Sequence, residues 1–99
     1  MGSLADLAGT HARFLKAELA LGFTFTTIAS QRYETGYEES AERSLGNAEK
    51  AYETVSRFLA DPKHTNRLTD AETRDITAKL ERLRGELMKL EGLRQGKMT

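Results

Sequence analysis

The sequence predicts an all-α protein, an antiparallel up-down-up three-helix bundle. Helix-favouring Ala, Leu, Glu, Lys and Arg are abundant, and Pro62 is the only proline among the 99 residues. Apolar residues recur every three or four positions in three segments, as on one face of a helix. The connections between these segments are short, which makes consecutive helices antiparallel. We expect a single helical domain over residues 1–99, with helices at about 3–33, 37–61 and 69–94.

The segment 3–33 carries more apolar side chains than one helix face needs. A first seam contains Leu4, Leu7, Phe14, Leu21, Phe25 and Ile28, and a second set contains Ala12, Leu15, Leu19 and Phe23. Together they cover far more than the usual apolar stripe of about 100°. Residues 23–26 alternate between Phe and Thr, as in a strand, but no other segment could pair with such a strand. We therefore predict a helix here.

The segment 37–61 begins after Gly36 and ends before Pro62, because a residue that precedes proline is pushed out of helical geometry. Its apolar stripe contains Tyr37, Ala41, Leu45, Ala48, Tyr52, Val55 and Leu59. The alanines in this stripe would let another helix approach closely. We expect a polar loop over the connection at 61–68.

The segment 69–94 has the clearest helical pattern. Thr69 and Glu72 form the Thr-x-x-Glu pattern of a capping box, which marks a helix start. One apolar seam follows, made of Ile76, Leu80, Leu83, Leu87 and Leu90. Two pairs of opposite charge four residues apart, Asp75 with Lys79 and Arg82 with Glu86, support the outer face. We expect this helix to fray near Gly92 or Gly96.

Three glycines lie inside the predicted helices, at Gly22, Gly46 and Gly85. Each costs about 1 kcal/mol relative to alanine in a helix interior. Close approach of another backbone or tolerated drift could explain Gly22 and Gly46, whereas Gly85, between two charged residues, fits drift.

Charge and composition exclude several classes of protein. The 15 basic and 15 acidic residues cancel, whereas nucleic-acid binders usually have a basic excess. There is no cysteine, so disulfides and thiolate zinc sites are excluded. The longest uncharged run, 19–31, is shorter than the about 20 residues of a bilayer span. With no signal-peptide pattern at the start, we expect a cytoplasmic protein that binds no nucleic acid and does not span a membrane.

Side chains that could perform chemistry are few and scattered. His11 and His64 are the only histidines. His11 has no second ligand one helical turn away, and His64 lies in the expected polar loop near Asp61, Lys63 and Asn66, where a catalytic pocket is not expected. The carboxylates of Glu38, Glu39 and Glu42 fit stabilisation of a helix N-terminus. Nucleotide-binding, nucleophile and zinc motifs are absent from the sequence. We therefore predict no enzyme, no catalytic residue, no metal and no cofactor.

Two short segments carry a family resemblance. Residues 36–41 read Gly-Tyr-Glu-Glu-Ser-Ala, and residues 78–81 read Ala-Lys-Leu-Glu. Over about 15–93 the chain resembles the MIT (microtubule interacting and transport) family and the related tetratricopeptide-like helical bundles. The resemblance implies a three-helix bundle without catalysis. It also implies that short helical or extended peptide tails bind in a groove beside the third helix.

The leading functional hypothesis is a non-enzymatic helical protein–protein interaction module. A three-helix bundle has no fourth helix to cover the side of Leu15, Leu19 and Phe23, and exposed apolar patches mark interfaces. With the groove beside the third helix, the candidate interaction surface contains Leu15, Leu19, Phe23, Arg84 and Met88. The partner would be a protein or peptide helix, or another copy of the chain in a homo-oligomer.

Two hypotheses from other classes stay open. His11 and Glu18 lie seven residues apart on one helix face and could serve a small enzyme or a ligand-binding bundle. A self-associating structural protein would also use the apolar side of the first helix. A membrane-surface helix over 14–29 is a poorer interpretation, because that helix lacks flanking Lys and Arg.

Overall fold

The protein is helical throughout the part of the chain that the structure describes. The computed structural model describes the backbone of residues 4–98 and the side chains of residues 11–96. Its helices are α1 (Leu4–Glu34), α2 (Glu38–Ala60), α3 (Pro62–Thr65) and α4 (Asp70–Met98). No strand occurs within residues 4–98, so the predicted all-α class is confirmed.

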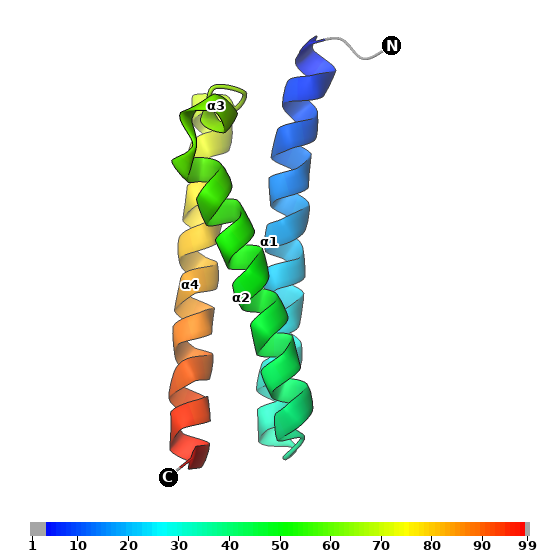
Figure 1. Cartoon of the computed structure of the whole chain (residues 1–99), viewed down its shortest axis with the longest axis vertical. Coiled ribbons are helices and arrows are strands. Elements are labelled where there is room, and N and C mark those ends of the chain that lie inside the picture. Colours follow the sequence, from blue (N-terminus) through cyan, green and yellow to red (C-terminus); the bar gives the residue numbers. More distant parts are fainter. Residues whose placement is uncertain (1–3, 99) are drawn as a thin grey trace.

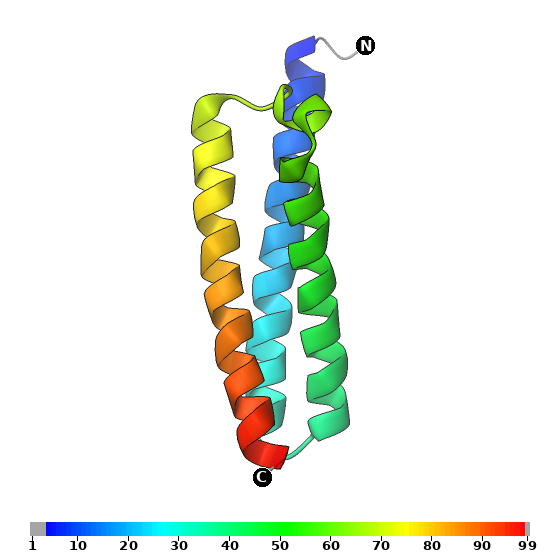
Figure 2. The ribbon, with the colours of Figure 1, turned by 60° about the vertical axis from the view of Figure 1, so that its left-hand side comes forward.

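The three long helices lie side by side. In Figure 1, α1 runs toward the lower end of the molecule, α2 returns to the upper end, and α4 runs down again. Figure 2 shows α3 at the upper end, between the end of α2 and the start of α4. Helix α1 packs against both α2 and α4, and α2 also packs against α4. The three long helices therefore share one packed centre.

The buried face of α1 is not the one that hydrophobicity predicts. Leu15 and Leu19, expected on an uncovered surface, are 0% and 1% exposed and pack against Val55, Ile76, Leu80 and Leu83. Phe14 and Leu21, from the predicted seam, are 47% and 49% exposed. Leu4 and Leu7 lie outside the described side chains. The placement of Leu15 and Leu19 on an open surface is therefore wrong.

The buried positions of α1 follow a regular spacing. The core positions of α1 alternate in steps of three and four residues and are Ala12, Leu15, Leu19, Gly22, Thr26, Ala29 and Tyr33. That spacing keeps one seam facing a partner along the whole helix. Thr26 can be buried because its hydroxyl donates to the carbonyl of Phe23 at 2.8 Å. The core face of α1 thus mixes large and small side chains.

Small residues in this seam allow close packing at Gly22. A Cβ atom added to Gly22 would lie 2.7 Å from Cδ2 of Leu83 and 3.4 Å from Cβ of Ala51. Gly22 therefore allows close approach of the other two long helices, one of the two readings left open by the sequence. At Gly46 and Gly85 an added Cβ would meet no atom within 4 Å. Neither Gly46 nor Gly85 is therefore needed for the close approach of another helix.

Most helix ends agree with the sequence, but α4 continues through Gly92 and Gly96, where the sequence predicts fraying, and ends at Met98. The capping box is confirmed, because the amide of Thr69 donates to Glu72 Oε1 at 2.9 Å and the amide of Glu72 donates to Thr69 Oγ1 at 3.0 Å. The predicted polar loop instead contains α3. Pro62 begins this short helix, and the Asp61 carboxylate caps it by accepting from the amide of Lys63 at 3.0 Å. Aspartate caps and N1 prolines both favour a helix start.

Ion pairs on α4 follow the predicted pattern in one case out of two. Lys79 Nζ lies 3.2 Å from Asp75 Oδ2, as expected, and Lys16 of α1 reaches the same oxygen at 3.9 Å. Arg82, predicted to pair with Glu86, instead lies over the ring of Phe23, 5.4 Å from its centroid. The packing of α1 against α4 thus provides Arg82 with an aromatic partner.

Candidate interaction surfaces

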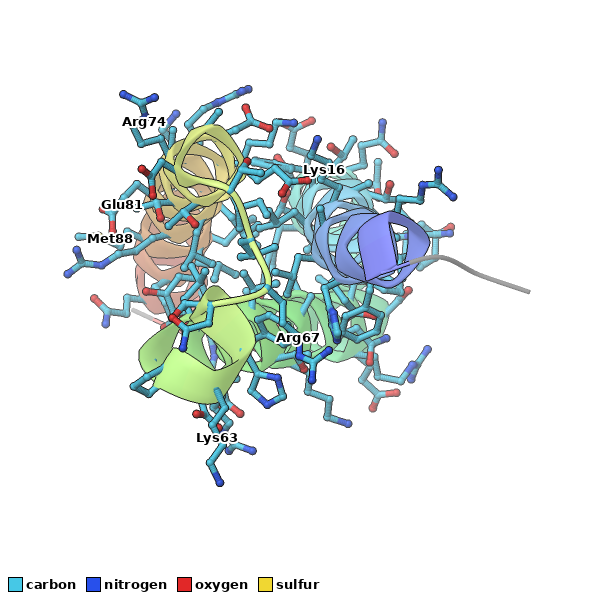
Figure 3. All side chains as sticks on the ribbon, turned by 90° about the horizontal axis from the view of Figure 1, so that it is seen from above. Lys16, Lys63, Arg67, Arg74, Glu81 and Met88 are labelled. Carbon is cyan, nitrogen blue, oxygen red and sulfur yellow. The ribbon has the colours of Figure 1, made fainter. Side chains whose placement is uncertain are left out.

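A groove of about 400 Å³ runs between α2 and α4. Its lining residues are Tyr52 from α2 and Arg84, Leu87, Met88, Glu91, Gly92 and Gln95 from α4. Tyr52 and Leu87 are half-buried against the core, whereas Met88 is 65% exposed. Figure 3 shows Met88 on the outer side of α4, away from α1. The groove therefore has an apolar floor and a freely accessible methionine on one wall.

Helical spacing places the α4 wall of this groove. Leu80, Leu83, Leu87 and Leu90 turn toward the bundle centre, as the sequence predicts. Arg84, Met88, Glu91 and Gln95 follow one another at steps of four, three and four, so they share the adjacent face. Arg84 and Met88, two of the predicted interaction residues, both line the groove.

The five predicted interaction residues do not form one surface. Leu15 and Leu19 belong to the core, and Leu19 only borders a hollow of about 220 Å³ between α1 and α4. Phe23 lines the same hollow with Lys79 and Arg82. Arg84 and Met88 lie in the other groove, between α2 and α4. The structure therefore separates the predicted set into a core pair, a site between α1 and α4, and a groove.

A polar network joins the three long helices at the lower end of the bundle. The Tyr33 hydroxyl of α1 donates to Glu42 Oε1 of α2 at 3.1 Å, and Arg94 Nε of α4 lies 3.0 Å from the same oxygen. Burial and the neighbouring Glu42 raise the pKa of Tyr33 to about 12. Arg94 also pairs with Glu91 at 3.6 Å. This network fixes the end of the groove to α1.

Glu49 shares its surroundings with several carboxylates of this network. Burial, followed by the negative charge of Glu91, raises the pKa of Glu49 above its usual value. Ionised Glu49 is therefore disfavoured in the folded chain relative to the unfolded one. Protonation of Glu49 as the pH falls through this raised pKa stabilises the fold.

We expect Glu49→Gln to raise the melting temperature at neutral pH. The gain should vanish below the ordinary glutamate pKa of about 4, because Glu49 is then protonated in both states. Thermal unfolding of both proteins at neutral and acid pH measures this difference. Glu86→Gln, on α4 and paired with Lys89 at 3.3 Å, is the control and should give no gain. An equal gain at both pH values would contradict the assigned cause.

The two histidines meet one aromatic ring. The His11 ring of α1 lies 5.7 Å from that of Phe58 on α2, and the His64 ring of α3 lies 4.3 Å from the same Phe58 ring. His64 Nε2 is 3.6 Å from Asp61 Oδ2. This aromatic contact joins three helices, and no sequence spacing predicts it.

Metal-binding clusters are missing from the described part of the chain. No group of three His, Asp or Glu side chains that could hold a metal ion occurs there. Among the described side chains, Nδ1 of His11 is buried without a hydrogen-bond partner. A ligand or an enzymatic role for His11 and Glu18 stays a prediction.

Comparison with known proteins gives no relative. The chain matches no protein-family model, no curated protein and no solved structure. The resemblance to the MIT and tetratricopeptide-like families therefore stays a prediction. None of the helices within the described residues combines the length and apolar character needed to cross a membrane.

Proposed function

We propose that the protein is a non-enzymatic, cytoplasmic interaction module, an up-down-up three-helix bundle that binds a protein helix or peptide in the groove between α2 and α4. The observation that carries this proposal is the groove itself, with Met88 exposed above a floor of Tyr52 and Leu87. Methionine is flexible and polarisable, so it adapts to apolar side chains of different shape.

The rim of the groove supports recognition of a peptide. Arg84 stands on one side with only an exposed partner, Glu81, at 3.8 Å, so its guanidinium can reach a peptide carbonyl or carboxylate. Glu91 lines the groove farther along α4 and offers an acceptor. An apolar floor with a few polar groups at its edge is the usual composition of a site that binds a helix or an extended segment.

Met88→Glu is expected to weaken peptide binding at least tenfold without unfolding the protein. Peptides from a displayed random library, selected on the unmodified protein, provide the probe, and titration calorimetry measures their affinity. An apolar side chain of the bound peptide would remove water from a carboxylate at position 88. This desolvation costs several kcal/mol unless the carboxylate is paired.

Leu93→Glu is the matched control, because Leu93 is also exposed on α4 at 43% but does not line the groove. The selected peptides should bind this variant as they bind the unmodified protein. Peptides that are insensitive to Met88→Glu, or equally sensitive to both variants, would contradict the assignment of the groove as the binding site.

A further inference from the structure

The outer face of α1 carries an uncovered apolar stripe, made of Phe14, Leu21, Phe25 and Ile28. Phe14 and Leu21 are about half-exposed, and the other two side chains are partly buried. These residues follow at steps of seven, four and three, so they share one face of the helix. The stripe is separate from the groove between α2 and α4, and it is not part of the core.

Contacts made by neighbouring residues of α1 show on which side of this helix the stripe lies. His11 of α1 packs on Phe58 of α2, whereas Lys16 reaches Asp75 of α4, and Figure 3 shows Lys16 directed toward α4. On the helical wheel, Phe14 and Leu21 lie next to the position of His11 and far from that of Lys16. The stripe therefore borders α2, on the side away from α4.

A row of basic residues follows the same side of the molecule on α2. Arg43, Lys50 and Arg57 are seven residues apart and exposed. Arg57 pairs with Glu53 at 3.6 Å, whereas Arg43 and Lys50 have no ion pair within 4.0 Å among the described residues. Uncharged Asn47 and Thr54 lie between this row and α1. The exposed Glu39 and Glu53 border the row on the side away from α1. The basic side chains therefore lie between these carboxylates and the apolar stripe of α1.

We propose that the outer stripe and the basic row together bind an amphipathic helix of another protein that carries acidic side chains along one edge. Its apolar face would cover Phe14, Leu21 and their neighbours, and its carboxylates would meet Arg43 and Lys50. Such an arrangement places a fourth helix beside α1 and α2. Charge complementarity of this kind determines which partners bind and how fast they associate.

The basic row disfavours a second copy of the chain in this place. An antiparallel two-fold pair that buries the stripe around Leu21 would bring the two copies of α2 together. Because Lys50 lies near the middle of the row, it would face its own counterpart, and Arg43 would face Arg57 of the other copy. Like charges placed opposite one another across an interface oppose association.

Glu18 disfavours a membrane surface. This half-buried glutamate lies between Phe14 and Leu21 along the edge of the stripe that borders α2. If these two apolar side chains entered a bilayer, the carboxylate of Glu18 would enter with them. Burying that charge in the membrane costs considerable free energy. A protein helix can place a polar side chain against it.

A helix-biased peptide library tests the proposal. Each non-apolar position is Glu or Lys in equal proportion, and the selection uses Met88→Glu protein, so that the groove between α2 and α4 is not available. We expect Glu to be enriched along one edge of the selected helices. Arg43→Glu with Lys50→Glu should lower their affinity at least tenfold, and a new selection on that variant should enrich Lys.

Leu21→Glu gives a second, independent variant, since the exposed Leu21 can be replaced without unfolding the protein. It should also lower the affinity at least tenfold, with an unchanged circular dichroism spectrum. Selection without Glu enrichment, no selected peptide at all, or peptides insensitive to these variants would overturn the proposal. So would a dimer that Leu21→Glu dissociates, or tighter binding to vesicles of equal parts phosphatidylcholine and phosphatidylserine than to the selected peptides.

Discussion

Leu19→Ala is expected to destabilise the protein by about 2–5 kcal/mol, the range for removal of a fully buried leucine side chain. Leu19 is almost completely buried between α2 and α4, in contact with the cluster that contains Val55 and Leu83. Truncation would leave a cavity that these neighbours cannot fill without moving. Urea denaturation, followed by far-ultraviolet circular dichroism, measures the change in the free energy of unfolding.

Leu21→Ala is the control on the same helix, two residues away. Because Leu21 is about half-exposed, its truncation should change the free energy of unfolding by no more than about 0.5 kcal/mol. A larger loss at position 21 than at position 19 would show that α1 presents its other face to the core. The pair of variants therefore tests the orientation of the helix and does not depend on absolute stability.

The orientation of α1 illustrates what hydrophobicity alone fails to determine. Both possible seams contain large apolar side chains, and the seam with Phe14, Leu21 and Phe25 has the larger ones. The buried seam includes Gly22 and Thr26, which contribute little apolar area. Close approach of α2 and α4 requires small residues, and the threonine hydroxyl is satisfied by a backbone carbonyl. Close packing of the three long helices therefore buries the less hydrophobic face of α1.

Features that depend on one helix alone were predictable. The capping box at Thr69 and the buried seam of α4 each follow from local spacing. The shared face of Arg84 and Met88 on α4 also follows from the spacing within that helix. The basic row on α2 suggests a binding site only when it is considered together with the apolar stripe on α1. A spacing rule within one helix cannot reveal that relation, because it depends on how α1 is rotated.

Gly22→Ala is expected to be less stable than Gly46→Ala by about 1–3 kcal/mol, the usual cost of overpacking a core. Both substitutions gain the same helix propensity, about 0.5–1 kcal/mol over glycine. At Gly46 the new methyl group meets no atom within 4 Å, so Gly46→Ala should be more stable than the unmodified protein. At Gly22 it would lie 2.7 Å from the buried Leu83 side chain.

The contact with Leu83 can be isolated by a double-mutant cycle. Leu83→Val removes the Cδ atoms that the new methyl group would meet, so Gly22→Ala should lose its penalty in that background. Chemical denaturation of the four proteins in the cycle measures the coupling free energy. A penalty that persists in the Leu83→Val background would place the strain in the backbone of α1 and not at Leu83. A penalty that disappears identifies the glycine as the residue that allows Leu83 to pack directly against the α1 backbone.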